Sequence, residues 1–284
     1  MNNHSKNKII DQLFQWFGIA NTFLGFVLLV FFIGYIIYIG AGRLDWDFFR
    51  SLPSRFPEKS GIYTAMIGSV WIMFLTALFA FPVGVAAAVY LEEYQKKGWL
   101  SKILEINISN LAGVPSIIYG LLGLQVFSRI LRLGGNLLAG SLTLSLLILP
   151  IVIVAAREAI KAVPHEIKEA SDALGASKWQ TIWHQTLPAA FGGILTGIIL
   201  AISRAVGEAA PLIVVGALAY VPFVPSSPLD EFSVLPIQIF NWISRPQAGF
   251  IVNAAAGIIV LLAITFTLNG LAMILRNKFE NKYQ

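Results

Sequence analysis

Long uncharged stretches alternate with short charged connections along the whole chain. Six such stretches are present, and only the fifth is interrupted, by Arg204 and Glu208. They cover residues 19–39, 61–91, 106–128 and 133–156, a stretch that starts near 189, and residues 246–275. A helix needs about 20 apolar residues to cross a bilayer. The pattern therefore predicts an all-α integral membrane protein with six transmembrane helices.

The first span and its flanks differ from the rest of the pattern. Apolar side chains at helical spacing predict an interfacial helix before the span: Ile9, Ile10, Leu13, Phe14 and Phe17. The connection over residues 43–60 is polar and contains two prolines. We therefore expect residues 1–60 to hold the interfacial helix, the first span and an external loop, and residues 61–284 to form a five-helix core.

Composition narrows the class of protein. Of the 284 residues, 57% are hydrophobic and 12% are charged, whereas a soluble domain carries roughly 25% charged residues. The chain has no cysteine, and its three histidines lie outside the apolar stretches. We expect no catalytic residues and no metal site, and hence a transporter subunit instead of an enzyme. The sequence also lacks a Gly-x-x-x-x-Gly-Lys-Ser/Thr loop, so energy must come from a partner or a gradient.

The basic residues predict the orientation in the membrane. Twelve lysines and arginines lie in the connections on one side, and seven lie in those on the other. Because cytoplasmic loops carry the excess of Lys and Arg, both termini and the loop over residues 157–188 should be cytoplasmic. The net charge of +5 is spread over loops between apolar stretches, which argues for the lipid bilayer and against nucleic acid as the partner.

The loop over residues 157–188 carries signals for two short helices. Pro164 suits a first turn, Glu166 complements the helix N-terminus, and Gly175 suits the C-terminal cap. After this cap, Ser177 and Gln180 have the spacing of a capping box. The first helix has a small apolar face, which predicts docking into a groove of another protein. A solvated loop helix is the alternative.

This loop resembles the EAA loop of the permeases of bacterial ABC importers. The similarity rests on Glu169-Ala170-Ser171, on Gly175 six residues after the glutamate, and on Leu187-Pro188. It departs from the family pattern at Ser171, usually alanine, and at Gln185, usually isoleucine. The resemblance implies that the first helix seats in a separate ATP-hydrolysing subunit. The residues that it assigns to this coupling are Glu166, Ile167, Glu169, Ala170, Leu174 and Gly175.

Arg204 and Glu208 are the only charged pair deep within an apolar stretch. On a straight helix Arg204 would lie roughly 24 to 27 Å from either end of its span, with Glu208 one turn farther on the same face. The pair either neutralises itself or serves transport, in which case Arg204 offers its guanidinium fork to an oxyanion. Gly207 and Pro211 predict a local distortion beside the charges. Arg157, at the cytoplasmic end of the fourth span, is a further candidate.

Three separated motifs resemble the PstA family, the permeases of phosphate-specific ABC importers. They are Gly113 to Leu121, Ala173 to Trp179, and Arg204 to Leu212, and the similarity runs from about residue 61 to residue 275. The resemblance implies an ABC importer permease core, import of inorganic phosphate, and a substrate path that includes Arg204, Glu208 and Ser116.

The same resemblance implies the rest of a complex. A PstC-like permease would complete a heterodimer, two copies of a PstB-like ATPase would bind ATP and Mg, and an external PstS-like protein would deliver phosphate. The chain would itself bind no cofactor and would lie in the bacterial cytoplasmic (inner) membrane. A permease for another oxyanion and a gradient-driven anion transporter are the alternatives.

The long outer connection, residues 221–250, is expected to form a short helix. It contains three prolines followed by an apolar stretch that ends at Phe240, Asn241 and Trp242. This helix would contact the binding protein, or it would anchor the loop at the membrane surface through Phe240 and Trp242.

Overall fold

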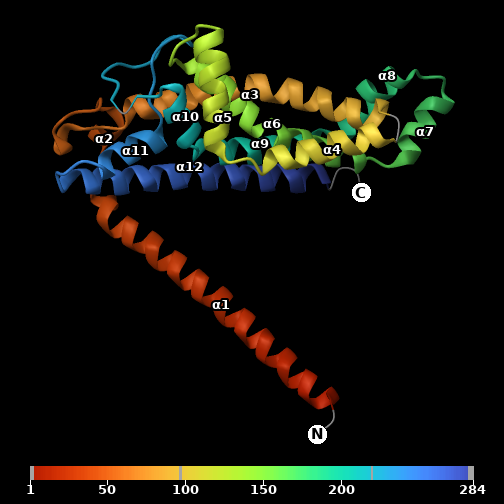
Figure 1. Cartoon of the computed structure of the whole chain (residues 1–284), viewed down its shortest axis with the longest axis horizontal. Coiled ribbons are helices and arrows are strands. Elements are labelled where there is room, and N and C mark those ends of the chain that lie inside the picture. The colour runs from red at the N-terminus through yellow and green to blue at the C-terminus, as the bar shows by residue number, and fades with distance from the viewer. Residues whose placement is uncertain (1–2, 96–97, 219, 281–284) are drawn as a thin grey trace.

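The computed structural model describes residues 3–95, 98–218 and 220–280, and every regular element in these residues is a helix (Figure 1). Lys96, Lys97 and Lys282, which enter the charge count above, lie outside the described residues. The long helices are α1 (Asn3–Gly40), α3 (Tyr63–Val89), α4 (Trp99–Ala112), α6 (Leu137–Lys161), α9 (Leu187–Val206) and α12 (Gly249–Glu280). The short ones are α2 (Trp46–Arg50), α5 (Ser116–Gly123), α7 (His165–Ala173), α8 (Lys178–Thr181), α10 (Ala210–Val215) and α11 (Leu235–Ile243). Two 3-10 helices are η1 (Ala41–Arg43) and η2 (Pro57–Lys59), and three π-helices are η3 (Tyr90–Tyr94), η4 (Leu124–Ile130) and η5 (Ile182–Thr186).

Helices α3, α6 and α9 form the centre of the bundle, and α6 is the most buried of the long helices. The crossing of α6 and α9 is close because Gly193 and Gly197 face two alanines. A Cβ on Gly193 would lie 2.8 Å from the Cβ of Ala159, and one on Gly197 would lie 2.4 Å from that of Ala155. Small residues at a crossing let helices approach closely in a membrane. This contact holds α9 close against α6.

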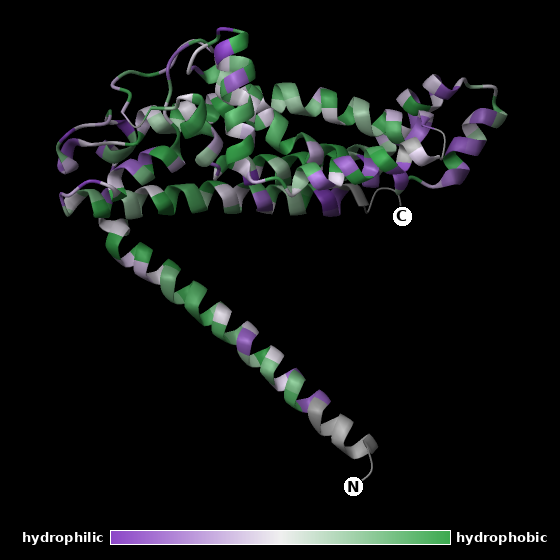
Figure 2. Ribbon diagram, viewed as in Figure 1, coloured by the Kyte–Doolittle hydropathy of each residue, from purple (hydrophilic) through white to green (hydrophobic). Residues whose placement is uncertain are grey.

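Five helical stretches are long and apolar enough to cross a membrane, and a sixth candidate is the pair formed by α4 and α5 with η4. The all-α membrane fold is therefore confirmed, and Figure 2 shows apolar residues along most of α1 and α12. The pair is bent by 98° between Ala112 and Ser116, so the third predicted span consists of two helices that meet at a sharp angle. Pro115 accounts for the bend because it lacks an N–H and disfavours helical backbone at Val114.

The fifth apolar stretch is a continuous helix followed by a break. α8, η5 and α9 join without interruption from Lys178 to Val206, so the second predicted loop helix is continuous with the span. Gly207 to Ala209 are not helical, and α10 follows. The prediction of a distortion beside the charges is confirmed. The placement of Arg204 midway along a straight span is wrong, because the helix stops two residues after it.

An apolar core closes the end of the bundle that holds α2 and α11 (Figure 1). Phe48 of α2, Trp242 of α11 and Phe250 of α12 are fully buried there. Trp242 therefore does not anchor the loop at a membrane surface, whereas Phe240 is 60% exposed. The boundary between units at residue 60 stays a prediction; Phe48 and Ile62, from its two sides, share this core.

Helix α1 diverges from the rest of the bundle (Figure 1). It meets α12 near Gly40, where a Cβ would lie 2.5 Å from the backbone N of Ala256. Residues 11–32 are exposed. The interfacial helix expected before the first span is continuous with that span. The exposed apolar length of α1 therefore offers a surface to lipid or to another membrane subunit.

Candidate functional site

The charged pair of the fifth stretch lies at the break between α9 and α10. Arg204 is in the last turn of α9, and Glu208 lies in the turn beyond Gly207. Arg204 Nε and Glu208 Oε1 are 4.0 Å apart, which is too far for a hydrogen bond. The Arg204 side chain is 57% exposed and that of Glu208 is 21% exposed. Within the described residues no hydrogen bond engages the Arg204 guanidinium, so its donors are available to a ligand.

Glycine and proline shape the turn at this break. The N–H groups of Gly207 and Glu208 donate to the carbonyl oxygens of Arg204 and Ala205, at 3.2 and 3.1 Å. Pro211 lies in the first turn of α10, where a missing N–H costs little. The charged pair thus sits on a short irregular segment between two helices. Such discontinuous helices are typical of substrate sites in transporters.

Helix α5 brings Ser116 to the same region. Gly120 packs against α10, and a Cβ on Gly120 would lie 2.8 Å from Pro211 Cα. Ser116 lies about one helical turn before Gly120, and Glu208 lies three residues before Pro211. The structure therefore gathers the elements that carry Arg204, Glu208 and Ser116. The role of these residues in transport stays a prediction.

Tyr119 holds the bend between α4 and α5. Its hydroxyl donates to the carbonyl oxygen of Leu111 at 2.8 Å, and its side chain is buried. The bond ties the last turn of α4 to the first turn of α5 and so orients the Ser116 end of α5. The sequence carries no signal for this role, because the hydrogen bond exists only once the chain is bent.

Arg157 is engaged by two carboxylates. Its Nε donates to Glu92 of η3 at 2.9 Å, and its Nη2 donates to Glu105 of α4 at 2.7 Å. The guanidinium therefore ties α6 to two other elements. These ion pairs argue against the hypothesis that Arg157 is a further oxyanion residue. Its partners come from 65 and 52 residues earlier in the chain, a distance over which the sequence pattern carries no signal.

The first predicted loop helix is α7. Pro164 is its N-cap, Glu166 lies in its first turn, and Gly175 follows it with a φ of +84°. This left-handed conformation favours glycine. The capping box of Ser177 and Gln180 is present at the start of α8. The start and stop signals of the first loop helix and the start signal of the second are therefore confirmed.

The side chains of α7 are divided between an outer and an inner face. Leu174 just beyond it is 89% exposed, and Glu166, Glu169 and Ala170 are exposed too. Ile167 instead packs against the core formed by α6 and α9. Ile167 is therefore only partly accessible, and its part in the predicted docking surface stays a prediction. Docking itself stays a prediction.

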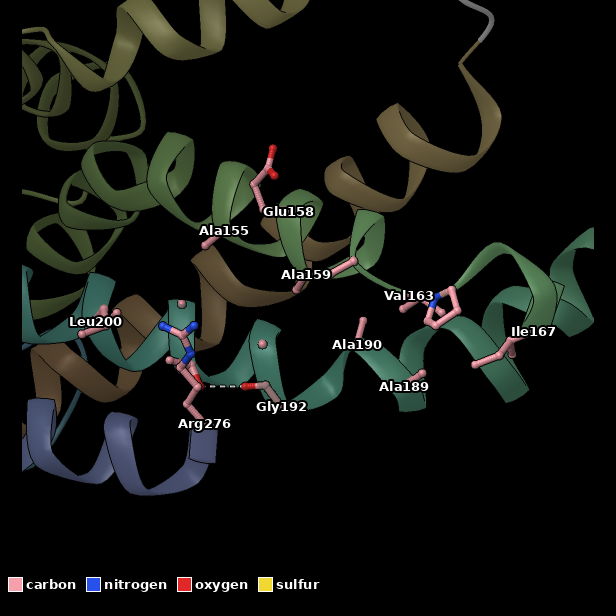
Figure 3. A pocket seen from close by; sticks show the side chains of 15 residues that line it. Ala155, Glu158, Ala159, Val163, Ile167, Ala189, Ala190, Gly192, Leu200 and Arg276 are labelled. Carbon is pink, nitrogen blue, oxygen red and sulfur yellow. Dashed lines mark hydrogen bonds between the residues drawn. The ribbon is translucent and has the colours of Figure 1, made fainter. Parts of the chain in front are cut away.

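A cavity of about 550 Å³ lies directly behind α7, between α6, α9 and α12 (Figure 3). Its walls are mostly alanine and glycine, with Ile167 at the α7 side. Glu158, Thr196 and Arg276 are the polar residues of the lining. Neither here nor elsewhere in the described residues do three or more His, Asp or Glu side chains gather as metal ligands would.

Residues 80–282 match the family described as the inner membrane component of binding-protein-dependent transport systems. The chain belongs to this family. The permease is 32% identical over 276 residues to the probable ABC transporter permease protein YqgI of Bacillus subtilis. The aligned residues cover 92% of the chain and 94% of YqgI. It is 31% identical over 280 residues to the phosphate transport system permease protein PstA 1 of Mycobacterium tuberculosis, covering 95% of the chain and 90% of that protein.

The fold of the permease is also that of a solved transporter subunit. A chain of the bacterial alginate ABC transporter, in complex with an alginate pentasaccharide-bound periplasmic protein, superposes with a TM-score of 0.62 at 16% identity, covering 95% of the permease and 97% of that chain. The resemblance to PstA-type permeases inferred from the sequence motifs is confirmed. The permease is a transmembrane subunit of an ABC importer and not an enzyme, and ATP hydrolysis belongs to a separate subunit.

Proposed function

We propose that the permease imports inorganic phosphate and forms one half of the translocation path. The observation that carries this proposal is the Arg204–Glu208 pair at the α9–α10 break. The guanidinium of Arg204 is exposed there, and its N–H groups can donate to a ligand. The PstA relative from Mycobacterium tuberculosis is a phosphate transport permease by name, which supports phosphate as the oxyanion.

The chemistry of the pair suits a protonated oxyanion. A guanidinium fork matches two oxygens of a tetrahedral anion at once. A carboxylate is an acceptor only, so in that form Glu208 can accept a hydrogen bond from the hydroxyl of a protonated phosphate. Sulfate has no such hydroxyl at neutral pH, and Glu208 would repel it. Between turnovers, Glu208 would hold Arg204 through the 4.0 Å contact.

The proposed complex contains one PstC-like permease, two copies of a PstB-like ATPase and an external PstS-like phosphate-binding protein. ATP and Mg would bind to the ATPase, and this chain would bind no cofactor. The exposed apolar length of α1 supports a second membrane subunit as one of its neighbours.

We further propose that the α7 end of the bundle is cytoplasmic, together with both termini. The C-terminal end of α12 lies beside the α7 end, and the N-terminal half of α1 runs toward the same end (Figure 1). The exposed residues Glu166, Glu169, Ala170 and Leu174 would then contact the ATPase, with Gly175 capping the helix that carries them. ATP-driven closure of the ATPase pair would move α7 and open the path outward.

The test is labelled-phosphate uptake by proteoliposomes that hold the complete complex. Arg204→Ala should lower uptake roughly ten- to hundredfold, the worth of a hydrogen bond to a charged group, and Arg204→Lys should recover only part of the loss. Copurification of the ATPase confirms that each variant assembles. Arg55→Ala, an exposed arginine outside the path, is the control.

Two results would contradict this function. Uptake by Arg204→Ala at the wild-type rate would reduce the pair to a structural role. Uptake of sulfate or another oxyanion by the wild type, with no uptake of phosphate, would replace phosphate as the substrate.

A further inference from the structure

A second group of charges surrounds the end of α3, away from the proposed path. Lys168 Nζ of α7 lies 2.5 Å from Glu93 Oε1 of η3, and these side chains are 20% and 11% exposed. The neighbouring Glu92 accepts a hydrogen bond from Arg157 of α6 at 2.9 Å. Neither the proposed phosphate path nor the exposed face of α7 uses these four residues.

The π-helix η3 lets two adjacent carboxylates serve different partners. A hydrogen bond from Gln95 N to Tyr90 O, at 3.0 Å, closes its wide turn. Adjacent side chains on a helix point to different sides, so Glu92 pairs with α6 while Glu93 pairs with α7. Short π-helical segments at the ends of or within α-helices are frequent at functional sites. η3 therefore connects three elements at one end of the bundle.

Helix α7 is also bound to α8, through residues one turn farther along the face that carries Lys168. Ser171 Oγ lies 2.9 Å from Thr181 Oγ1, and Thr181 Oγ1 donates to Asp172 Oδ1 at 3.2 Å. Thr181 is only 5% exposed, and α8 continues into α9. These hydroxyl contacts attach α7 to α9, whereas the Lys168–Glu93 ion pair attaches α7 to α3.

We propose that Lys168 and Glu93 are a positioning pair for coupled transport, which makes α3 follow α7 when the ATPase moves α7. This role rests on the proposed docking of α7 on the ATPase. Without the pair, α7 would still pull α9 through Thr181, but α3 would follow only through its packing against α6 and α9 and would lose its direct tie to α7. Both charges are largely removed from water, so the loss of either partner leaves the other charge buried and unpaired.

A positioning role and a purely structural role have different consequences. Structural damage lowers the amount of intact complex, so phosphate import and ATP hydrolysis fall together. Loss of positioning leaves the ATPase bound and active, so ATP is hydrolysed while fewer phosphate ions are imported. The ratio of phosphate imported to ATP hydrolysed separates these two roles.

The experiment measures both rates on the same proteoliposomes with the complete complex. Lys168→Gln and Glu93→Gln should each lower the ratio about tenfold, which is within the range of typical coupling between sites. The double reversal Lys168→Glu with Glu93→Lys should restore most of the ratio, and it also decides the matter if a single variant fails to assemble. Lys161→Gln is the matched control, because Lys161 is exposed and lies nearby at the end of α6. An unchanged ratio in the single variants, or a reversed pair no better than they are, would overturn the proposal.

A second measurement is independent of the transported ion. The chain has no cysteine, so spin labels can be placed by His165→Cys on α7 and Tyr90→Cys on η3, at positions that are 80% and 57% exposed. In complexes in nanodiscs, the distribution of distances between the labels should keep its width when ATP is added. With Lys168→Gln present, ATP should broaden it.

The two measurements keep two failures apart. Equal widths with and without Lys168→Gln would overturn the positioning role whichever ion the complex carries. A second case is a complex whose wild type imports no phosphate but whose Lys168→Gln variant shows a distance distribution broadened by ATP. That result would support the positioning role and overturn the phosphate assignment alone.

Discussion

Replacement of Gly120 by alanine should separate α5 from α10 and displace the charged turn beside them. The new Cβ would lie 2.8 Å from Pro211 Cα and 3.0 Å from both Pro211 O and Val214 Cβ. Non-bonded carbon atoms prefer about 3.5 to 4.0 Å, so the helices must move apart by roughly 1 Å. The opposing atoms belong to backbone and to the branching carbon of a valine, and none of them can rotate away.

The energetic cost follows from two opposing effects. Overpacking of this kind costs about 1 to 3 kcal/mol, and the better helix propensity of alanine returns about 1 kcal/mol. We expect a net loss of stability of about 1 kcal/mol for Gly120→Ala. The functional loss should be larger, at least about tenfold in phosphate uptake, because a misplacement of 1 Å is costly where groups must be aligned.

The assay combines unfolding of the purified permease in detergent with phosphate uptake by the complete complex. Gly270→Ala is the matched control, since Gly270 also lies in a helix and nothing is within 4 Å of its Cβ position. That control should be as stable as the wild type or more stable. If Gly120→Ala matches Gly270→Ala in both stability and uptake, the α5–α10 contact does not hold the path in place.

Two further predictions concern the bend and the outer loop. Tyr119→Phe removes the 2.8 Å bond to Leu111 O and should lower stability by about 1 kcal/mol, as measured by thermal unfolding in detergent; an unchanged midpoint would show that the bend holds without this bond. Hydrogen bonds from the backbone N–H groups of Ser226 and Ser227 lower the pKa of Asp230, so the carboxylate stabilises its loop above the unfolded pKa of about 3.9. This stabilisation should be lost as the pH falls through the lowered folded pKa. The rate at which an acid-stable protease cleaves the loop should therefore rise over that pH range in the wild type. In Asp230→Asn, the cleavage rate should not change over that pH range, and a parallel rise in both proteins would contradict the assignment.

Local signals in the sequence predicted local structure well. The cap at Gly175 and the capping box of Ser177 and Gln180 depend on residues three or four positions apart, and both are present. The distortion after Arg204 follows in the same way from Gly207 and Pro211 nearby. In each case the physical cause lies within one or two helical turns of its effect.

Contacts between distant segments could not be predicted in this way. The pairing of Arg157 with Glu92 and Glu105 depends on how three helices pack, and a charge at the end of a span looks the same whether it is paired or free. Trp242 shows the converse problem, because an interfacial tryptophan and a buried one have the same apolar neighbours in sequence. Arg204 lies near the end of α9 and not midway along a continuous helix, because the helix does not run on past Gly207.

The helix from Lys178 to Val206 is unbroken, so the fifth span can move as one rigid body. Its 29 residues are about 42 Å long at 1.5 Å per residue, so a tilt of about 5° at the α8 end displaces the far end by roughly 4 Å. Arg204 lies at that far end, and the non-helical residues 207–209 keep the displacement from passing directly into α10. A small rotation close to α7 would therefore become a larger movement of the charged site while the backbone hydrogen bonds of the helix stay intact.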